Sequence, residues 1–182
     1  MKRGFIHVSA IILTLLFCLQ LSAKVVQAGL TDPWAIDTRY SFSSPSSISY
    51  FVNSDLSEYS VDTYVNKWCQ ASNRLGFIRK PDVPSTSITI THSRNINNGT
   101  YGTTSFADRN HKTITFYALF FKSTTTTSQR NEVIVHEVGH ALGLDHPHIY
   151  ADQSKAVMRG EGFNNKAYPL YGDIRGIQSL YE

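Results

Sequence analysis

Three histidines are spaced so that they could bind one metal ion. His136 and His140 are four positions apart, which places both imidazoles on the same face of a helix. Two such imidazoles can coordinate Zn²⁺, and a catalytic zinc site needs three protein ligands and one open position. Gly143 can adopt a positive φ and turn the chain, so that His146 reaches the same metal. The sequence therefore predicts a three-histidine zinc site.

Glu137 lies next to the first of these histidines and is not needed to hold the metal. A carboxylate at this position could accept a proton from a zinc-activated water and later pass it to the leaving amine. We therefore expect a zinc-dependent endopeptidase with Glu137 as general base. The alternative is a non-catalytic module that uses zinc structurally and binds peptide or glycan. Glu137 argues against this alternative, because a degenerate site would more often have lost its base.

The histidines require a helix to position them. A hydroxyl-rich stretch at residues 123–128 can cap a helix that runs to Gly143, with apolar residues from Val133 to Leu142. Before it, the spacing of apolar residues predicts strands at 48–52, 88–91, 101–106 and 112–117, and a helix at 57–75 with Cys69 on its buried stripe. A short helix at 172–181 closes the chain. This order predicts an α+β domain.

At this point the chain resembles the metzincin metalloproteases. Residues 136–146 match the motif H-E-x-x-H-x-x-G-x-x-H at every fixed position. Met158, within residues 156–160, resembles the methionine turn of these enzymes, and residues 169–181 are similar to the closing helix of the matrixin branch. The resemblance implies a zincin-like fold, in which a twisted, mostly parallel sheet and the zinc helix meet a small C-terminal subdomain at a cleft.

The residue after the third histidine departs from the matrixin pattern. Pro147 is typical of the serralysin branch, whereas matrixins usually have serine there. Serralysins, however, carry a tyrosine where this chain has Gly160, and they append glycine-rich calcium-binding repeats that this sequence lacks. A compact, matrixin-like enzyme fits better.

The resemblance also implies where substrate and other metals would bind. An extended peptide would pair with the strand at 102–106, so Gly102, Thr103 and Thr104 are candidate substrate-binding residues. A pocket beside the zinc would include Tyr168, Pro169 and Leu170 and would favour a hydrophobic residue after the scissile bond. Matrixins hold a second zinc and calcium; the only nearby candidate ligands are His92, Asp108 and His111, so a second zinc or calcium stays open.

The N-terminal residues have the layout of a secretory signal peptide. Lys2 and Arg3 precede a nearly uncharged run, and cleavage is expected after Ala28, with Ala23 as the alternative. We expect residues 29–182 to form a single secreted, extracellular metalloprotease domain. The run is also long enough to serve as an uncleaved membrane anchor, and this alternative stays open.

The charge balance limits the expected partners. Removing the three basic residues of the signal segment from the 17 in the chain leaves 14, which equals the 14 acidic residues. A neutral mature chain gives no reason to expect a nucleic-acid partner or stable membrane association after signal cleavage. We expect a monomer that acts on protein or peptide substrates.

Overall fold

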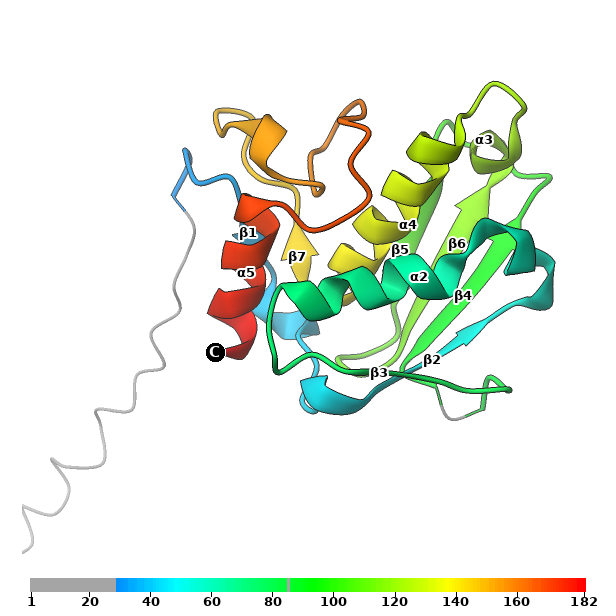
Figure 1. Cartoon of the computed structure of the whole chain (residues 1–182), viewed down its shortest axis with the longest axis horizontal. Coiled ribbons are helices and arrows are strands. Elements are labelled where there is room, and N and C mark those ends of the chain that lie inside the picture. The colour runs from blue at the N-terminus through cyan, green and yellow to red at the C-terminus, as the bar shows by residue number, and fades with distance from the viewer. Residues whose placement is uncertain (1–28, 85) are drawn as a thin grey trace, which may run out of the picture.

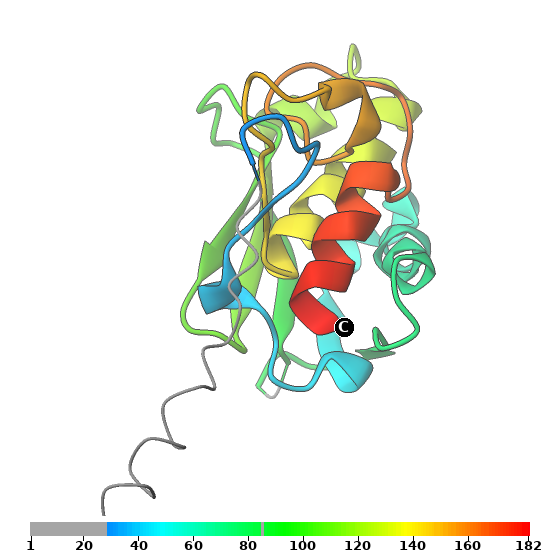
Figure 2. The same cartoon turned by 90° about the vertical axis from the view of Figure 1, so that its left-hand side faces the viewer.

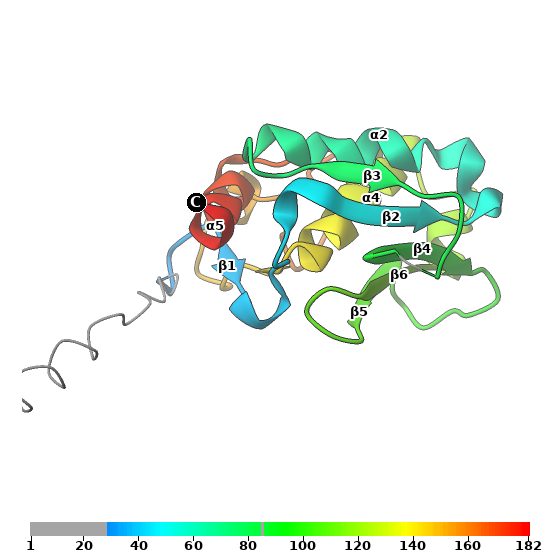
Figure 3. The same ribbon diagram turned by 90° about the horizontal axis from the view of Figure 1, so that it is seen from below.

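A computed structural model describes residues 29–84 and 86–182 of the chain, so the proposed signal segment at 1–28 lies outside the described residues. Within them, five strands form one sheet in the order β3-β2-β4-β6-β5 (Figures 1 and 3). Strands β2, β3, β4 and β6 are parallel, and the edge strand β5 is antiparallel to β6. The bounds are β2 Ile48–Val52, β3 Phe77–Arg79, β4 Ile88–Ser93, β5 Gly102–Phe106 and β6 Lys112–Tyr117.

The main helices lie on the same side of this sheet (Figure 2). They are α2 Val61–Val65, α4 Thr127–Ala141 and α5 Tyr171–Tyr181, with the short α3 Ala118–Phe121 after β6. The strands alternate buried and half-buried residues, as in β2 and β6, because one face of the sheet packs against the helices. This arrangement confirms the predicted α+β fold with a mostly parallel sheet.

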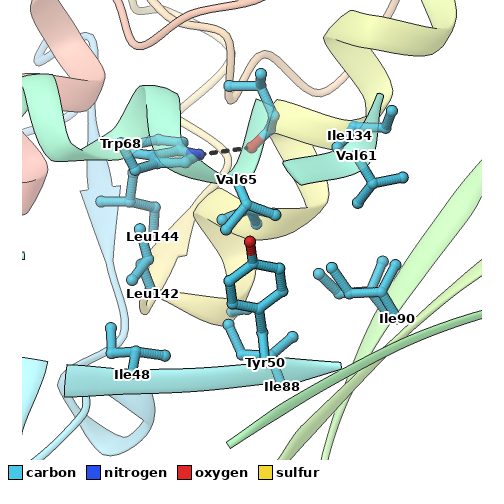
Figure 4. Packing of buried hydrophobic residues seen from close by; sticks show 14 of the residues in the cluster. Ile48, Tyr50, Val61, Val65, Trp68, Ile88, Ile90, Ile134, Leu142 and Leu144 are labelled. Atoms are coloured by element: carbon cyan, nitrogen blue, oxygen red, sulfur yellow. Dashed lines mark hydrogen bonds between the residues drawn. The ribbon is translucent and has the colours of Figure 1, made fainter. Parts of the chain in front are cut away.

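Helix α4 carries His136 and His140 and is therefore the predicted zinc helix. The core between the sheet and α4 holds this helix in place (Figure 4). Ile88, Ile90 and Ile134 are fully buried there. The buried indole of Trp68 donates its Nε1–H to the carbonyl oxygen of Val135 at 3.0 Å. Val135 directly precedes His136, so a residue 67 positions earlier in the chain fixes the backbone of α4 where the histidines begin.

The predicted helix at 57–75 falls on helical structure, but this structure ends at Gln70 and is only partly α-helical. The structure has a 3-10 helix η3 at Ser54–Tyr59, the single turn α2, and a second 3-10 helix η4 at Asn66–Gln70. Because a 3-10 helix has three residues per turn, the buried positions are Val65, Trp68 and Ala71. The prediction of a buried Cys69, which assumed α-helical spacing, is therefore wrong, and Cys69 is exposed.

The C-terminal part of the chain returns to the N-terminal segment. Strand β1, Ala35–Ile36, pairs antiparallel with β7, Leu144–Asp145, and the Asp37 N–H donates to the Gly143 carbonyl at 2.8 Å. Helix α5 packs beside this pair (Figure 1). Among the described residues, no helix is long and apolar enough to cross a bilayer.

Candidate metal centre

A cleft of about 610 Å³ runs between the edge strand β5, helix α4 and the segment that follows β7. Its walls combine main-chain atoms of β5 with the side chains of α4 and of residues 157–163. The lining residues are Gly99, Thr100, Tyr101, Gly102, Thr103, Thr104, Phe106, Glu132, Val133, His136, Glu137, His140, Asp145, His146, Val157, Arg159, Gly160, Gly162 and Phe163. All three predicted zinc ligands and the predicted base border this single cleft.

The three histidines converge on one point. His136 Nε2 lies 3.1 Å from the Nε2 atoms of His140 and His146, and the latter two are 3.2 Å apart. His136 and His140 are one turn apart on α4, whose N-terminus is closed by a capping box between Thr126 and Gln129. The chain then turns at Gly143, whose φ is +95°, and brings His146 to the same point.

Hydrogen bonds fix which ring nitrogens face that point. His136 Nδ1 donates to the Val157 carbonyl at 2.9 Å, and His140 Nδ1 donates to the Leu144 carbonyl at 3.0 Å. Each of these two rings, when neutral, therefore presents an unprotonated Nε2. Burial, together with the neighbouring imidazoles, lowers the pKa of His136 to about 3 and that of His140 to about 4, so both are neutral at pH 7.

This geometry fits a zinc ion. In a tetrahedral site with Zn–N bonds of 2.0–2.1 Å, two ligand nitrogens lie about 3.3 Å apart, close to the spacing of the three Nε2 atoms. Lone pairs that face each other at such distances repel unless a cation lies between them. Of the residues that the structure describes, these three histidines form the only group of three potential metal ligands whose atoms lie within 4.8 Å of one another.

Glu137 is buried beside the histidines and contacts the edge strand. The Thr104 hydroxyl lies 2.8 Å from Glu137 Oε2. A side chain on Gly102 would place its Cβ 3.1 Å from Glu137 Cγ, so the absence of a side chain at this position gives the carboxylate room. Burial raises the pKa of Glu137 to about 7, although the hydrogen bond from Thr104 opposes this.

Met158 is buried against α4 beside Gly139, and its segment is linked to His136 through the backbone. The Asp173 carboxylate on α5 accepts the N–H groups of Val157 at 2.7 Å, Met158 at 3.1 Å and Leu170 at 2.7 Å. Since the Val157 carbonyl also accepts the His136 ring, one buried aspartate holds the turn that orients a predicted ligand. Burial raises the pKa of Asp173 to about 6, and these N–H groups limit the rise.

The structure brings together only part of the predicted substrate-binding set. Gly102, Thr103 and Thr104 line the cleft, whereas Tyr168, Pro169 and Leu170 are not among its lining residues.

The candidate ligands for a second metal do not form one site. His92 Nε2 lies 3.2 Å from Asp55 Oδ2, whereas His111 Nδ1 pairs with Asp108 at 2.8 Å. Within the described residues, no second metal-ligand group includes any of them.

Sequence reasoning missed the partners of the predicted base and the full cleft wall. Thr104 was predicted to contact substrate, but nothing in the spacing of a strand and a helix predicts its hydrogen bond to Glu137. Glu132 was not singled out, although it lies four positions before His136, so the helical spacing could have placed it on the same face. Arg159 and Phe163 border the cleft from a segment without regular structure, which leaves no periodic signal.

Comparison with protein families gives one clear match. The matrixin peptidase family model matches residues 82–182, which is more than half of the chain. A curated relative, macrophage metalloelastase from Oryctolagus cuniculus, is 44% identical over an alignment of 61 residues, and the match covers 27% of this chain and 10% of the relative. The chain thus matches only a small part of this curated relative.

Solved structures share the fold at low sequence identity. A crystal structure of myroilysin has a TM-score of 0.57 at 14% identity and covers 78% of this chain and 86% of that one. The GM1-bound form of the ECX AB5 holotoxin contains a chain with a TM-score of 0.56 at 14% identity, covering 85% of this chain and 91% of that one. These likenesses concern the fold alone.

Proposed function

Because this chain belongs to the matrixin family of zinc metalloendopeptidases, we propose that it hydrolyses peptide bonds in the cleft beside His136, with Glu137 as general base. The observation that carries the proposal is the convergence of three histidine Nε2 atoms beside a buried carboxylate. His136, His140 and His146 would hold the zinc.

When bound there, zinc polarises the substrate carbonyl and lowers the pKa of water. The protein's own groups do the remaining work. Glu137 accepts the proton of the attacking water and delivers it to the leaving amine. Burial raises the pKa of its carboxyl, which favours the second of these tasks. A nearby cation lowers this pKa again, which favours the base form.

Strand β5 is the proposed site of substrate alignment. It is the edge of the sheet, and β6 pairs with one side of it only. An extended peptide could add to the free side through main-chain hydrogen bonds, which would place a substrate carbonyl near the histidines. Gly102, Thr103 and Thr104 line the cleft along this strand. This mode of binding suits an endopeptidase, because it reads the backbone of any extended chain.

We further propose that residues 1–28 direct export and that residues 29–182 form the mature extracellular enzyme, a single catalytic domain. Matrixins are typically extracellular, which supports this assignment. Sequencing the N-terminus of the exported protein tests it. The expected first residue is Gly29, and Lys24 would indicate cleavage after Ala23. A retained Met1 in a membrane fraction would support the anchor instead.

Hydrolysis of casein by residues 29–182 tests the activity. The assay is run with zinc, with a chelator and with the Glu137→Gln variant. We expect zinc-dependent cleavage and a loss of about 10²–10⁴-fold in Glu137→Gln. The variant should still bind one equivalent of zinc, because Glu137 is not a ligand. A wild type that binds zinc but cleaves neither casein nor a diverse peptide library would point to a binding module.

A further inference from the structure

The proposed mechanism does not use Glu132, a buried acid in the wall of the cleft. It lies on α4 one turn before His136, borders the cleft and is only 3% exposed. Its Oε1 accepts the Asn164 N–H at 3.0 Å. Its Oε2 is closed off from solvent and has no hydrogen-bond partner among the described residues.

An unpartnered buried carboxylate oxygen requires an explanation, because losing hydration without a partner costs several kcal/mol. Burial raises the pKa of Glu132, whereas the N–H groups of residues 164–166 and the charge of Arg159 oppose this rise. Oε1 accepts the Asn164 N–H and so anchors the loop at residues 160–166, but this bond does not account for Oε2. Arg159 borders the same cleft, but its Nε donates to the Glu161 carbonyl at 2.7 Å, and no ion pair joins it to Glu132 in the described part of the chain.

The cleft that Glu132 borders has aromatic and apolar walls, which suit a long side chain with a charged end. Tyr101 and Phe163 both line the cleft and meet edge to face with ring centroids 5.2 Å apart. Val133, the next residue along α4, also borders the cleft. Such walls can pack against the aliphatic part of lysine or arginine, and aromatic faces attract the cation itself. One helical turn is about 5.4 Å, which an extended lysine or arginine side chain can span.

We propose that Glu132 makes the enzyme selective for a substrate with lysine or arginine at a position next to the scissile bond, its cation pairing with the Glu132 carboxylate. This inference rests on the proposed peptidase function. It replaces the expectation of a purely hydrophobic pocket. Of the two expected walls of this pocket, the zinc helix contributes Glu132, whereas residues 168–170 do not line the cleft.

The test is a set of quenched fluorescent peptides that differ only at the two positions flanking the cleaved bond. Each position carries lysine, arginine, acetyl-lysine or norleucine in turn. At one of the two positions, we expect the wild type to cleave the lysine and arginine peptides about 10-fold or more faster in kcat/KM than the neutral ones. Acetyl-lysine keeps the length of lysine and removes its charge, so this comparison needs no variant.

Glu132→Gln then separates charge recognition from loop anchoring. Glutamine keeps an oxygen for the Asn164 N–H but has no charge, so we expect the preference for lysine and arginine to disappear while norleucine peptides are still cleaved. The matched control is Glu161→Gln, which neutralises an exposed acid of the adjacent loop that does not line the cleft; the preference should remain.

Three outcomes would contradict the inference, and they can be told apart. A wild type that cleaves all the peptides without favouring the charged ones overturns the selectivity but leaves the peptidase function intact. A preference that survives in Glu132→Gln shows that another group recognises the cation. Failure to cleave any peptide or casein overturns the proposed function and this inference with it.

Discussion

The Thr104 side-chain oxygen lies 2.8 Å from Glu137 Oε2 and 2.9 Å from the main-chain carbonyl oxygen of the same residue. A hydroxyl has one proton, so it can donate to only one of these oxygens at a time. When Glu137 is ionised, the hydroxyl can donate to the carboxylate. When Glu137 is protonated, Glu137 can donate to Thr104, which then donates to the carbonyl. Thr104 can thus support the base in both of its protonation states.

Thr104→Val keeps the shape of the side chain and removes this hydroxyl. We expect kcat to fall about 10-fold with little change in KM, because an unsupported carboxylate loses its orientation rather than its affinity for substrate. Steady-state kinetics on one fluorescent peptide measures both constants. Thr104→Ser should restore most of the rate.

Thr89→Val is the control for Thr104→Val, because Thr89 is a half-buried strand threonine whose hydroxyl contacts Thr86 away from the cleft. Its kcat should match that of the wild type. Equal losses in the two valine variants would show that the effect is a general one on the sheet.

Gly139→Ala should destabilise the domain. A Cβ at Gly139 would overlap the Met158 sulfur and come within 2.8 Å of the Trp68 ring, and both side chains are fully buried. Overpacking of this kind costs about 1–3 kcal/mol. Urea unfolding measures the free energy. Gly160→Ala is the matched control, since its Cβ would meet nothing closer than 3.7 Å, and unchanged stability in both variants would contradict the packing described here.

The stability of the fold should rise between pH 7 and pH 9. Burial lowers the pKa of Lys112 to about 7, whereas the unfolded chain keeps a value near 10.5. Over this interval the unfolded state binds more protons than the folded state, so the free energy of unfolding increases with pH, by about 1–2 kcal/mol. Urea unfolding at pH 7, 8 and 9 measures the rise.

Lys112→Met should remove most of this pH dependence. The lysine Nζ donates to the Arg109 carbonyl at 2.7 Å and lies 3.2 Å from the centre of the Phe42 ring, so methionine can fill the same space without a charge. Loss of the bond to Arg109 changes the absolute stability of the variant, so the slope with pH is the diagnostic quantity. A variant with the same slope as the wild type would show that another group titrates.

Removal of zinc should lower the melting temperature. A ligand that binds only the folded state stabilises it by about 4 kcal/mol at a concentration 1,000 times its Kd. We therefore expect a chelator to lower the melting temperature of the wild type in differential scanning fluorimetry. His140→Ala should melt near the chelated wild type and respond little to added zinc. An equal response of the variant and the wild type to zinc would contradict the assignment of His140 as a ligand.

The sequence predicted those elements whose residues repeat with a regular spacing. Strands β2 and β6 have the predicted bounds, and α4 begins and ends close to the expected residues. The short strands β1, β3 and β7 were not predicted, because two or three residues carry no period and form strands only through their partners. Cys69 was misplaced for a related reason: the change from α to 3-10 geometry leaves no clear mark in composition.

In the candidate site too, residues related by regular spacing were predicted and contacts between distant segments were not. His136, Glu137 and His140 are local in sequence, so helical geometry alone relates them. The cleft wall depends on contacts between distant segments, such as Thr104 with Glu137 or Glu132 with Asn164. Such contacts follow from tertiary packing, which pattern reasoning on one sequence cannot resolve.

The pairing of β1 with β7 also bears on the order in which the site forms. His136 and His140 are related by one helical turn, which can form early and locally. His146 follows β7, whose partner β1 comes from the other end of the chain. Closing so long a loop is slow compared with forming a helix. We therefore expect the nascent protein to carry two ligands in register well before the third, so that zinc is captured late, when β1 and β7 pair.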